Sequence, residues 1–92
     1  MIKYIVEFVG TLIFLSVILS QGQAVPIAIA LAAVIFFGGA ISGGHYNPAV
    51  SVMMYLNNNL ADSDLFLYII SQVMGGVVAL SIFKTYVEVL KK

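Results

Sequence analysis

The residues able to take part in chemistry are concentrated in one short stretch, Ser42 to Val50, with the sequence SGGHYNPAV. It holds the only histidine of the chain, two glycines, an asparagine and one of the two prolines. The histidine has no second metal ligand at a helical spacing, and no Ser–His–acid set is present, so the sequence predicts neither a metal site nor an enzyme. No cofactor is expected. What remains is hydrogen bonding by an amide side chain and a glycine-rich backbone.

The rest of the chain is unusually apolar. Of its 92 residues, 62% are hydrophobic and 9% are charged, and the mean hydropathy is +1.10. A soluble domain is about one quarter charged, and a chain this short buries only about 60–70% of its unfolded surface. The bilayer is therefore the expected solvent. The net charge of zero does not indicate a nucleic-acid partner, and the absence of cysteine excludes disulfides and thiolate metal sites.

Three apolar segments are long enough to cross that bilayer. They predict helices over about 2–20, 25–41 and 63–84, because a helix of about 20 residues spans the ~30 Å hydrocarbon core and lone strands would leave backbone groups unpaired there. The first segment could instead be a signal peptide, although no cleavage site stands out. In the polar stretch NNNLADSD, Asp62 or Ser63 is expected to cap the third helix, and Asp64 to favour its N-terminal dipole.

The stretch 42–56 predicts a loop followed by a short helix. Asn47 is a good N-cap residue and Pro48 then occupies the first helical position. From Pro48 to Leu56 the helix is only about 13–14 Å long, which is half a bilayer. A re-entrant half-helix fits this length, since irregular backbone at membrane depth must be buried in protein or line a water-filled cavity. The alternative is an amphipathic segment lying at the interface, but the basic face of such helices is missing.

The motif ISGGHYNPAV resembles the first signature loop of the aquaporin (major intrinsic protein) family, and of its bacterial water-channel branch in particular. VEFVGTLIFL resembles the first helix of that family, and YIISQVMGGVVAL resembles its third helix. The resemblance covers nearly all of the chain. It implies an all-α membrane protein with three transmembrane helices and one re-entrant half-helix, which is one half of the aquaporin inverted repeat.

The resemblance also implies roles for the residues of the loop. Asn47 would donate a hydrogen bond to passing water at mid-membrane, and Pro48 and Ala49 would hold the tip of the half-helix against its symmetry mate. The remaining residues would line the pore, through backbone carbonyls or as an apolar wall: Gly43, Gly44, His45 and Val50. Independently of the family, a half-helix N-terminus carries about +0.5 of a charge, which disfavours cations while neutral water can be relayed.

Three residues outside the loop are further candidates. Ile27 falls where the family places a selectivity-filter residue, and it is aliphatic where the bacterial water channels usually carry an aromatic one. Glu7 and Gln72 would brace the loop by hydrogen bonds. The alternative for Glu7 is exposure at the interface, since it lies near the start of its helix. For the His45 side chain, packing or a backbone hydrogen bond is expected rather than metal binding.

One departure from the family concerns completeness. Known members carry two inverted halves in one chain, and the second loop is followed by a filter arginine, whereas this sequence has one half and no arginine. Half a pore cannot conduct alone. The expected function is therefore a passive channel for water, and next for small uncharged solutes such as glycerol, in which this chain supplies half of the pore. The expected location is the cell membrane.

Three arrangements remain open for the missing half. A second copy could insert in the opposite orientation as an antiparallel dimer, or a separate chain could supply the second half. In the third, the chain is a non-conducting fragment or a structural subunit. The lysines permit mixed insertion, because the family orientation would place Lys3 inside and Lys84, Lys91 and Lys92 outside, against the positive-inside rule.

Overall fold

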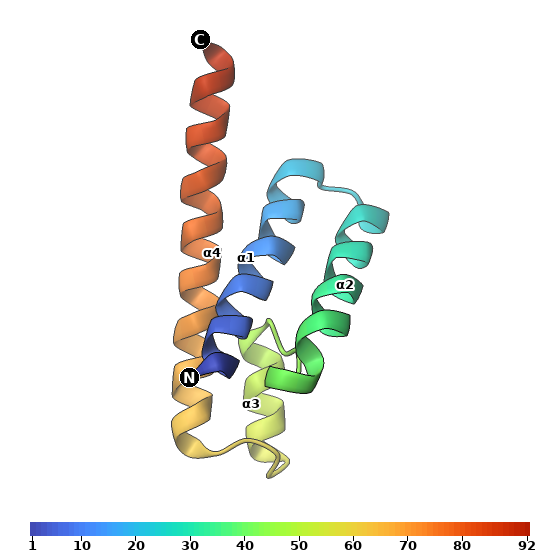
Figure 1. Cartoon of the computed structure of the whole chain (residues 1–92), viewed down its shortest axis with the longest axis vertical. Helices are drawn as coiled ribbons and strands as arrows, with labels where there is room; N and C mark the ends of the chain where they lie inside the picture. The colour runs from blue at the N-terminus through green and yellow to red at the C-terminus, as the bar shows by residue number, and fades with distance from the viewer.

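The computed structural model describes residues 1–92 as four helices joined by short connections (Figure 1). Three of them are long and apolar enough to cross a membrane, and the third in chain order is the short one. The predicted fold class is therefore confirmed. The helices are α1 (Ile2–Gln21), α2 (Ala24–Ser42), α3 (Pro48–Leu56) and α4 (Asp62–Lys91).

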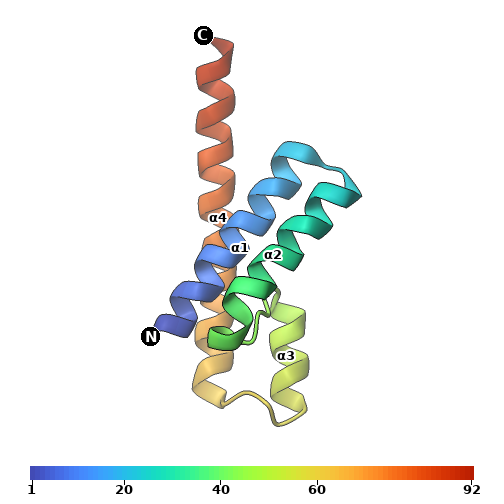
Figure 2. The ribbon, with the colours of Figure 1, turned by 45° about the vertical axis from the view of Figure 1, so that its right-hand side comes forward.

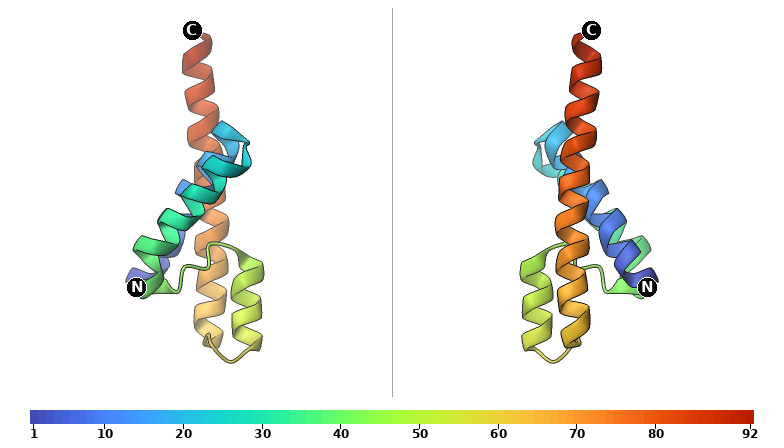
Figure 3. Two further views of the ribbon diagram at one scale, coloured as in Figure 1. Left: turned by 90° about the vertical axis from the view of Figure 1, so that its right-hand side faces the viewer. Right: turned by 90° about the vertical axis from the view of Figure 1, so that its left-hand side faces the viewer.

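Helix α1 is the central element of the molecule. It packs against α2 on one side and α4 on the other, while α3 packs against α4. Figure 2 shows α1 and α2 side by side and inclined to α4. Figure 3 shows α3 beside the N-terminal part of α4. After α2 the chain passes through the loop 43–47, runs along α3 and turns back into α4.

Local chemistry explains where most helices begin and end. α1 ends before Gly22 and α2 before Gly43, with φ angles of 64° and 91° that residues with a Cβ rarely adopt. α3 begins as predicted, with Asn47 as its N-cap and Pro48 in its first turn. The start of α4 differs from expectation: its N-cap is Ala61, without a side-chain hydrogen bond, so neither Asp62 nor Ser63 caps it.

Helix α4 also runs further than the apolar pattern of the sequence predicts. It ends at Lys91 rather than near residue 84 and has 30 residues, or about 45 Å of helix. No glycine or proline follows Gly76, so nothing in the sequence stops the helix. The charged residues after the apolar run are instead part of the helix surface, where Lys91 and Glu88 form a weak pair at 3.7 Å. The last turns therefore extend beyond a hydrocarbon core of ~30 Å.

Polar and apolar residues are distributed in the reverse of the soluble pattern. Large apolar side chains are exposed on the outside of the helices, such as Phe36 at 80% and Phe37 at 78%. Six of the thirteen buried residues are polar or charged: Glu7, Thr11, Ser42, His45, Ser51 and Gln72. Lipid can solvate the apolar exterior, whereas buried polar groups must bond to one another.

Close approach of α1 and α4 depends on one small residue. A Cβ on Gly75 would lie 2.8 Å from the Phe8 carbonyl oxygen and 3.2 Å from the Leu12 nitrogen, both of which are backbone atoms. Because backbone atoms of a helix cannot rotate away, any larger residue pushes the two helices apart. Small residues at such crossings are typical of helix packing in membranes.

Gly75→Ala should therefore destabilise the bundle, and Gly76→Ala is its matched control. Both changes gain helix propensity, but the new Cβ of Gly76→Ala meets only the end of the Leu15 side chain, at 3.1 Å, which can rotate. We expect Gly75→Ala to be less stable than the control by about 1–3 kcal/mol, the cost of overpacking. Unfolding in detergent, followed by circular dichroism, measures both. Equal stabilities would contradict the close approach.

Candidate functional site

The centre of the polar interior is the carboxylate of Glu7, which is fully buried. One oxygen accepts from the backbone N–H of Tyr46 at 2.8 Å and from Nε2 of Gln72 at 2.9 Å. The other accepts from the backbone N–H of His45 at 3.0 Å and from the hydroxyl of Ser42 at 2.7 Å. These four donors come from the end of α2, the loop and α4. Glu7 is therefore not exposed at an interface; it connects three segments of the chain.

These bonds also orient the carbonyls of the loop. The chain has no cis peptide bonds, and in a trans peptide the carbonyl points opposite to the N–H. The N–H groups of His45 and Tyr46 point inward at Glu7. The carbonyls of the same two peptide units, which belong to Gly44 and His45, must then point away from Glu7, toward the other side of the loop.

A second layer of hydrogen bonds holds the half-helix against α4. Nε2 of Gln72 is also 2.9 Å from the hydroxyl oxygen of Ser51, in α3, and the same oxygen is 2.9 Å from Nδ1 of His45. The His45 ring packs on the edge of Tyr68, with centroids 5.1 Å apart. The two residues that the sequence suggested as braces, Glu7 and Gln72, thus lie in direct contact, and the histidine is a packed and hydrogen-bonded one.

Tyr46 anchors the loop from the other side. Its φ of 53° is uncommon for a residue with a side chain. The conformation is held at both ends: the backbone N–H bonds to Glu7, and the hydroxyl donates to the Val34 carbonyl at 2.6 Å. The ring lies against Gly10, where any Cβ would overlap it. Burial of this tyrosine therefore fixes the loop to both α1 and α2.

Asn47 has a divided role at the tip of the half-helix. Its side-chain oxygen accepts from the backbone N–H of Ala49 at 2.8 Å, which caps α3. This leaves the amide NH2 without a partner in the chain. The residues Asn47, Pro48 and Ala49 are all exposed, while Val50 is half-buried. An exposed donor therefore stands at the N-terminal end of the α3 dipole.

Ile27 lies apart from this group. It is in the first turn of α2 and is half-buried, and about 22 Å of helix separates it from Ser42, where the loop begins. Gly43 and Gly44 lie in the loop with φ angles of 91° and 65°, exposed and half-buried respectively. The structure thus gathers the candidates from the loop, α1 and α4 but not the one from α2.

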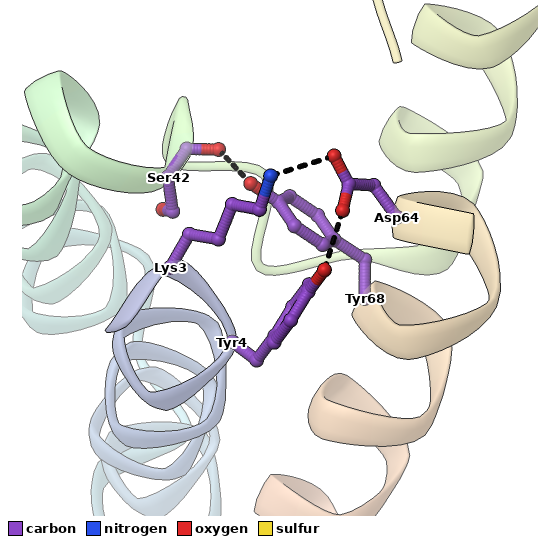
Figure 4. Close-up of polar contacts among 5 residues, drawn as sticks. All are labelled: Lys3, Tyr4, Ser42, Asp64 and Tyr68. Carbon is purple, nitrogen blue, oxygen red and sulfur yellow. Dashed lines mark hydrogen bonds and ion pairs between the residues drawn. The ribbon is translucent and has the colours of Figure 1, made fainter. Parts of the chain in front are cut away.

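A second polar cluster joins the N-terminal ends of α1 and α4 (Figure 4). The Lys3 ammonium lies 2.7 Å from one oxygen of Asp64, and the Tyr4 hydroxyl donates to the other at 2.5 Å. Tyr68 stands edge-on to Tyr4 and donates its hydroxyl to the Ser42 carbonyl at 2.6 Å. Asp64 is thus neutralised by a partner. Because the Lys3 side chain is 37% exposed, this pair contributes little stability.

Sequence reasoning assigned no role to Ser42, Tyr46, Ser51 or Tyr68. Tyr46 lies inside the quoted motif, and an aromatic residue in a glycine-rich loop was the available signal for it. Ser51 and Tyr68 carried none, because their partners are far along the chain and follow no helical spacing. Chemically, the assembled group offers one free amide donor and outward carbonyl acceptors, so it suits neutral molecules that form hydrogen bonds.

Comparison with known proteins gives the family. The family model for "Major intrinsic protein" matches residues 1–92. "Glycerol uptake facilitator protein-like 6" of Lactiplantibacillus plantarum is 38% identical over 96% of this chain and 45% of its own length. "Aquaporin Z" of Photorhabdus laumondii is 34% identical over 66% of this chain and 26% of its own length. This chain thus spans less than half of either relative. No solved structure matches it.

The Glu7 network yields a prediction about the loop. In Glu7→Gln, whichever way the new amide turns, its NH2 faces the backbone N–H of either His45 or Tyr46. Each donor left unpaired costs about 1–3 kcal/mol. We expect faster amide hydrogen exchange at one or both of these residues and lower stability. Glu88→Gln is the matched control: Glu88 lies in an exposed ion pair, so this variant should change neither the exchange rates nor the stability. Unaltered exchange in Glu7→Gln would contradict the bracing role.

Proposed function

Because the chain belongs to the major intrinsic protein family and is an integral membrane protein, we propose that it forms half of a passive channel. The channel passes water and small uncharged solutes such as glycerol. A second copy of this chain or a separate second half completes it. The observation that carries the proposal is the free amide NH2 of Asn47 at the exposed tip of the half-helix. The side-chain oxygen of the same residue caps that helix.

Transport in such a path is an exchange of hydrogen bonds. A water molecule arriving at the tip gives up bonds to its neighbours and accepts one from Asn47 Nδ2, while the carbonyls of Gly44 and His45 accept its hydrogens. These carbonyls are free to do so because their peptide N–H groups bond to Glu7. The N-terminus of α3 repels cations with about half a charge. A neutral solute can exchange its hydrogen bonds to water for bonds to these groups, whereas a cation is repelled by the helix terminus.

The geometry also supports the need for a second half. The half-helix has nine residues and crosses about half of a bilayer, so its tip ends near the midplane with nothing covering Asn47, Pro48 and Ala49. A second, inverted tip would close the path there. An antiparallel copy is compatible with the charges: Lys3 is paired with Asp64 at one end, and Lys91 with Glu88 at the other.

Two features bear on the solute. One of the relatives is named a glycerol uptake facilitator and another is named Aquaporin Z. The aliphatic side chain of Ile27 would contribute an apolar wall rather than an aromatic one to the narrow part of the path. Both favour a path that admits small alcohols as well as water. A non-conducting structural subunit is the alternative outcome of the tests that follow.

Osmotic shrinkage of liposomes that contain only this chain, followed by light scattering, tests the path. If a second copy completes the path, we expect water flux well above that of bare lipid. Asn47→Leu should then lose about five- to tenfold, since one hydrogen bond of about 1–1.5 kcal/mol is missing at the narrowest point. Asn47→Asp keeps the capping oxygen but lacks the NH2, so it should lose flux too. Asn59→Leu, in the exposed turn, is the matched control.

The possible results separate the proposals. Full flux in Asn47→Leu, with the protein inserted, would contradict the placement of Asn47 in a path. Flux no higher than bare lipid for the unmodified chain would exclude a path made by copies of this chain. Co-reconstitution with a second half from a relative would then separate the split channel, which regains flux, from the structural subunit, which does not.

Cross-linking tests whether the partner is a second copy. The chain has no cysteine, so a single introduced thiol gives a clean signal. In an inverted pair the two tips meet at the midplane, so Ala49→Cys should form a disulfide between copies, which requires Cα atoms within about 7 Å. Leu56→Cys, at the far end of α3 and 73% exposed, should not. Equal cross-linking at both positions would indicate random collisions rather than an inverted pair.

A further inference from the structure

The imidazole of His45 has one bonded nitrogen and one free one. Nδ1 lies 2.9 Å from the Ser51 hydroxyl oxygen. Nε2 has no hydrogen-bond partner in the chain. The only buried side-chain N or O atoms that lack both solvent contact and a partner are Thr11 Oγ1 and Gln72 Oε1. Nε2 is not among them, so it reaches a surface of the molecule although the residue as a whole is only 7% exposed.

The direction of each hydrogen bond in the network follows from Glu7. A carboxylate can only accept, so the group of Gln72 that faces it must be the NH2. The second hydrogen of that NH2 points at the hydroxyl oxygen of Ser51, 2.9 Å away. Ser51 is therefore an acceptor toward Gln72. The charge of Glu7 thus fixes the orientation of the Gln72 amide. This charge is three hydrogen bonds away from the His45 imidazole.

The Ser51 hydroxyl hydrogen then has one available acceptor. Ser51 is fully buried, so an unpaired hydrogen would be costly. Its oxygen makes no hydrogen bond to a carbonyl of the preceding helical turn, and its only other partner is Nδ1 of His45. The hydroxyl must donate to Nδ1, which must then be unprotonated. In a neutral imidazole the proton is consequently on Nε2.

We infer that the relay Glu7–Gln72–Ser51 fixes His45 as the Nε2–H tautomer, and that this N–H is a second side-chain donor for oxygen acceptors of water or small alcohols. From the sequence, His45 is expected to contribute only its backbone carbonyl to the pore. This inference rests on the proposed function for the identity of the solute. The tautomer itself rests only on the hydrogen bonds.

The position of Nε2 fits this role. A Cβ on Gly43 would lie 3.2 Å from it, so the nitrogen stands directly beside the exposed Gly43 in the loop. The carbonyls of Gly44 and His45 leave the same loop on the side away from Glu7. In the proposed path this N–H would supply a donor at Gly43, so a water molecule could accept a hydrogen bond there before it reaches Asn47. Gly43 would keep this approach open because it has no side chain.

The chain has one histidine, so nitrogen NMR of ¹⁵N-histidine-labelled protein in lipid reports on this imidazole alone. We expect Nδ1 to be unprotonated and hydrogen-bonded, and Nε2 to be protonated, with magnetisation transfer from Nε2–H to water. A dominant Nδ1–H signal would overturn the inference. So would an Nε2–H proton that has no contact with water.

Variants of the relay test whether Ser51 is the cause. In Ser51→Ala, Nδ1 loses its donor, and we expect the Nδ1–H population to rise several-fold. Ser51→Thr keeps the hydroxyl and should restore the original tautomer, which a merely structural role of Ser51 would not require. Ser71→Ala, whose hydroxyl donates to the Leu67 carbonyl, is the matched control and should change nothing. Equal tautomer populations in Ser51→Ala and the unmodified chain would overturn the relay.

The NMR experiment and the flux experiment fail independently. The tautomer is measured whether or not the chain conducts, so loss of the proposed channel leaves the relay standing as a property of the loop. A wrong tautomer in a chain that conducts and depends on Asn47 would overturn the inference about His45 alone.

Discussion

A buried carboxylate in a chain surrounded by lipid is the constraint on which the structure depends. An unpaired charge there would be expensive, and Glu7 avoids the cost only because four donors converge on it. Two of the donors are backbone N–H groups of the loop. The need to satisfy one side chain therefore dictates the conformation of a segment almost forty residues away. Once these N–H groups point inward, the carbonyls of the same peptides must point outward.

The same constraint accounts for the composition of the interior. In a soluble protein the core is apolar and the surface polar, whereas here six of the thirteen buried residues are polar or charged. Helix association cannot rely on removing apolar surface from water, since lipid is equally apolar. It relies on close backbone contact at Gly75 and on hydrogen bonds that cross between helices. These bonds are directional, so they also determine which nitrogen or oxygen is left free at the loop.

The free groups and the bonded groups belong to the same residues. Asn47 uses its oxygen as a helix cap, so its NH2 remains available. His45 uses Nδ1 for Ser51, so Nε2 remains available. In each of these side chains one atom braces the loop and another is free for the proposed contact with solute. The selectivity of the proposed path therefore depends on the stability of the loop. The chain spans less than half of the length of either relative.

The sequence by itself determined the solvent, the fold class, the three spans and the half-helix, because hydropathy and caps are local properties that tertiary contacts seldom override in lipid. It also indicated Glu7 and Gln72 as braces, although only through a resemblance. It predicted the end of the last helix poorly, because the apolar run ends at Phe83 although no glycine or proline follows it. Only the tertiary structure decided the rest. The pairs Lys3–Asp64 and Gln72–Glu7 lie 61 and 65 residues apart, and Ser51 acts on His45 across a helix start. No spacing rule along the chain can predict such contacts, because they arise from how the helices cross.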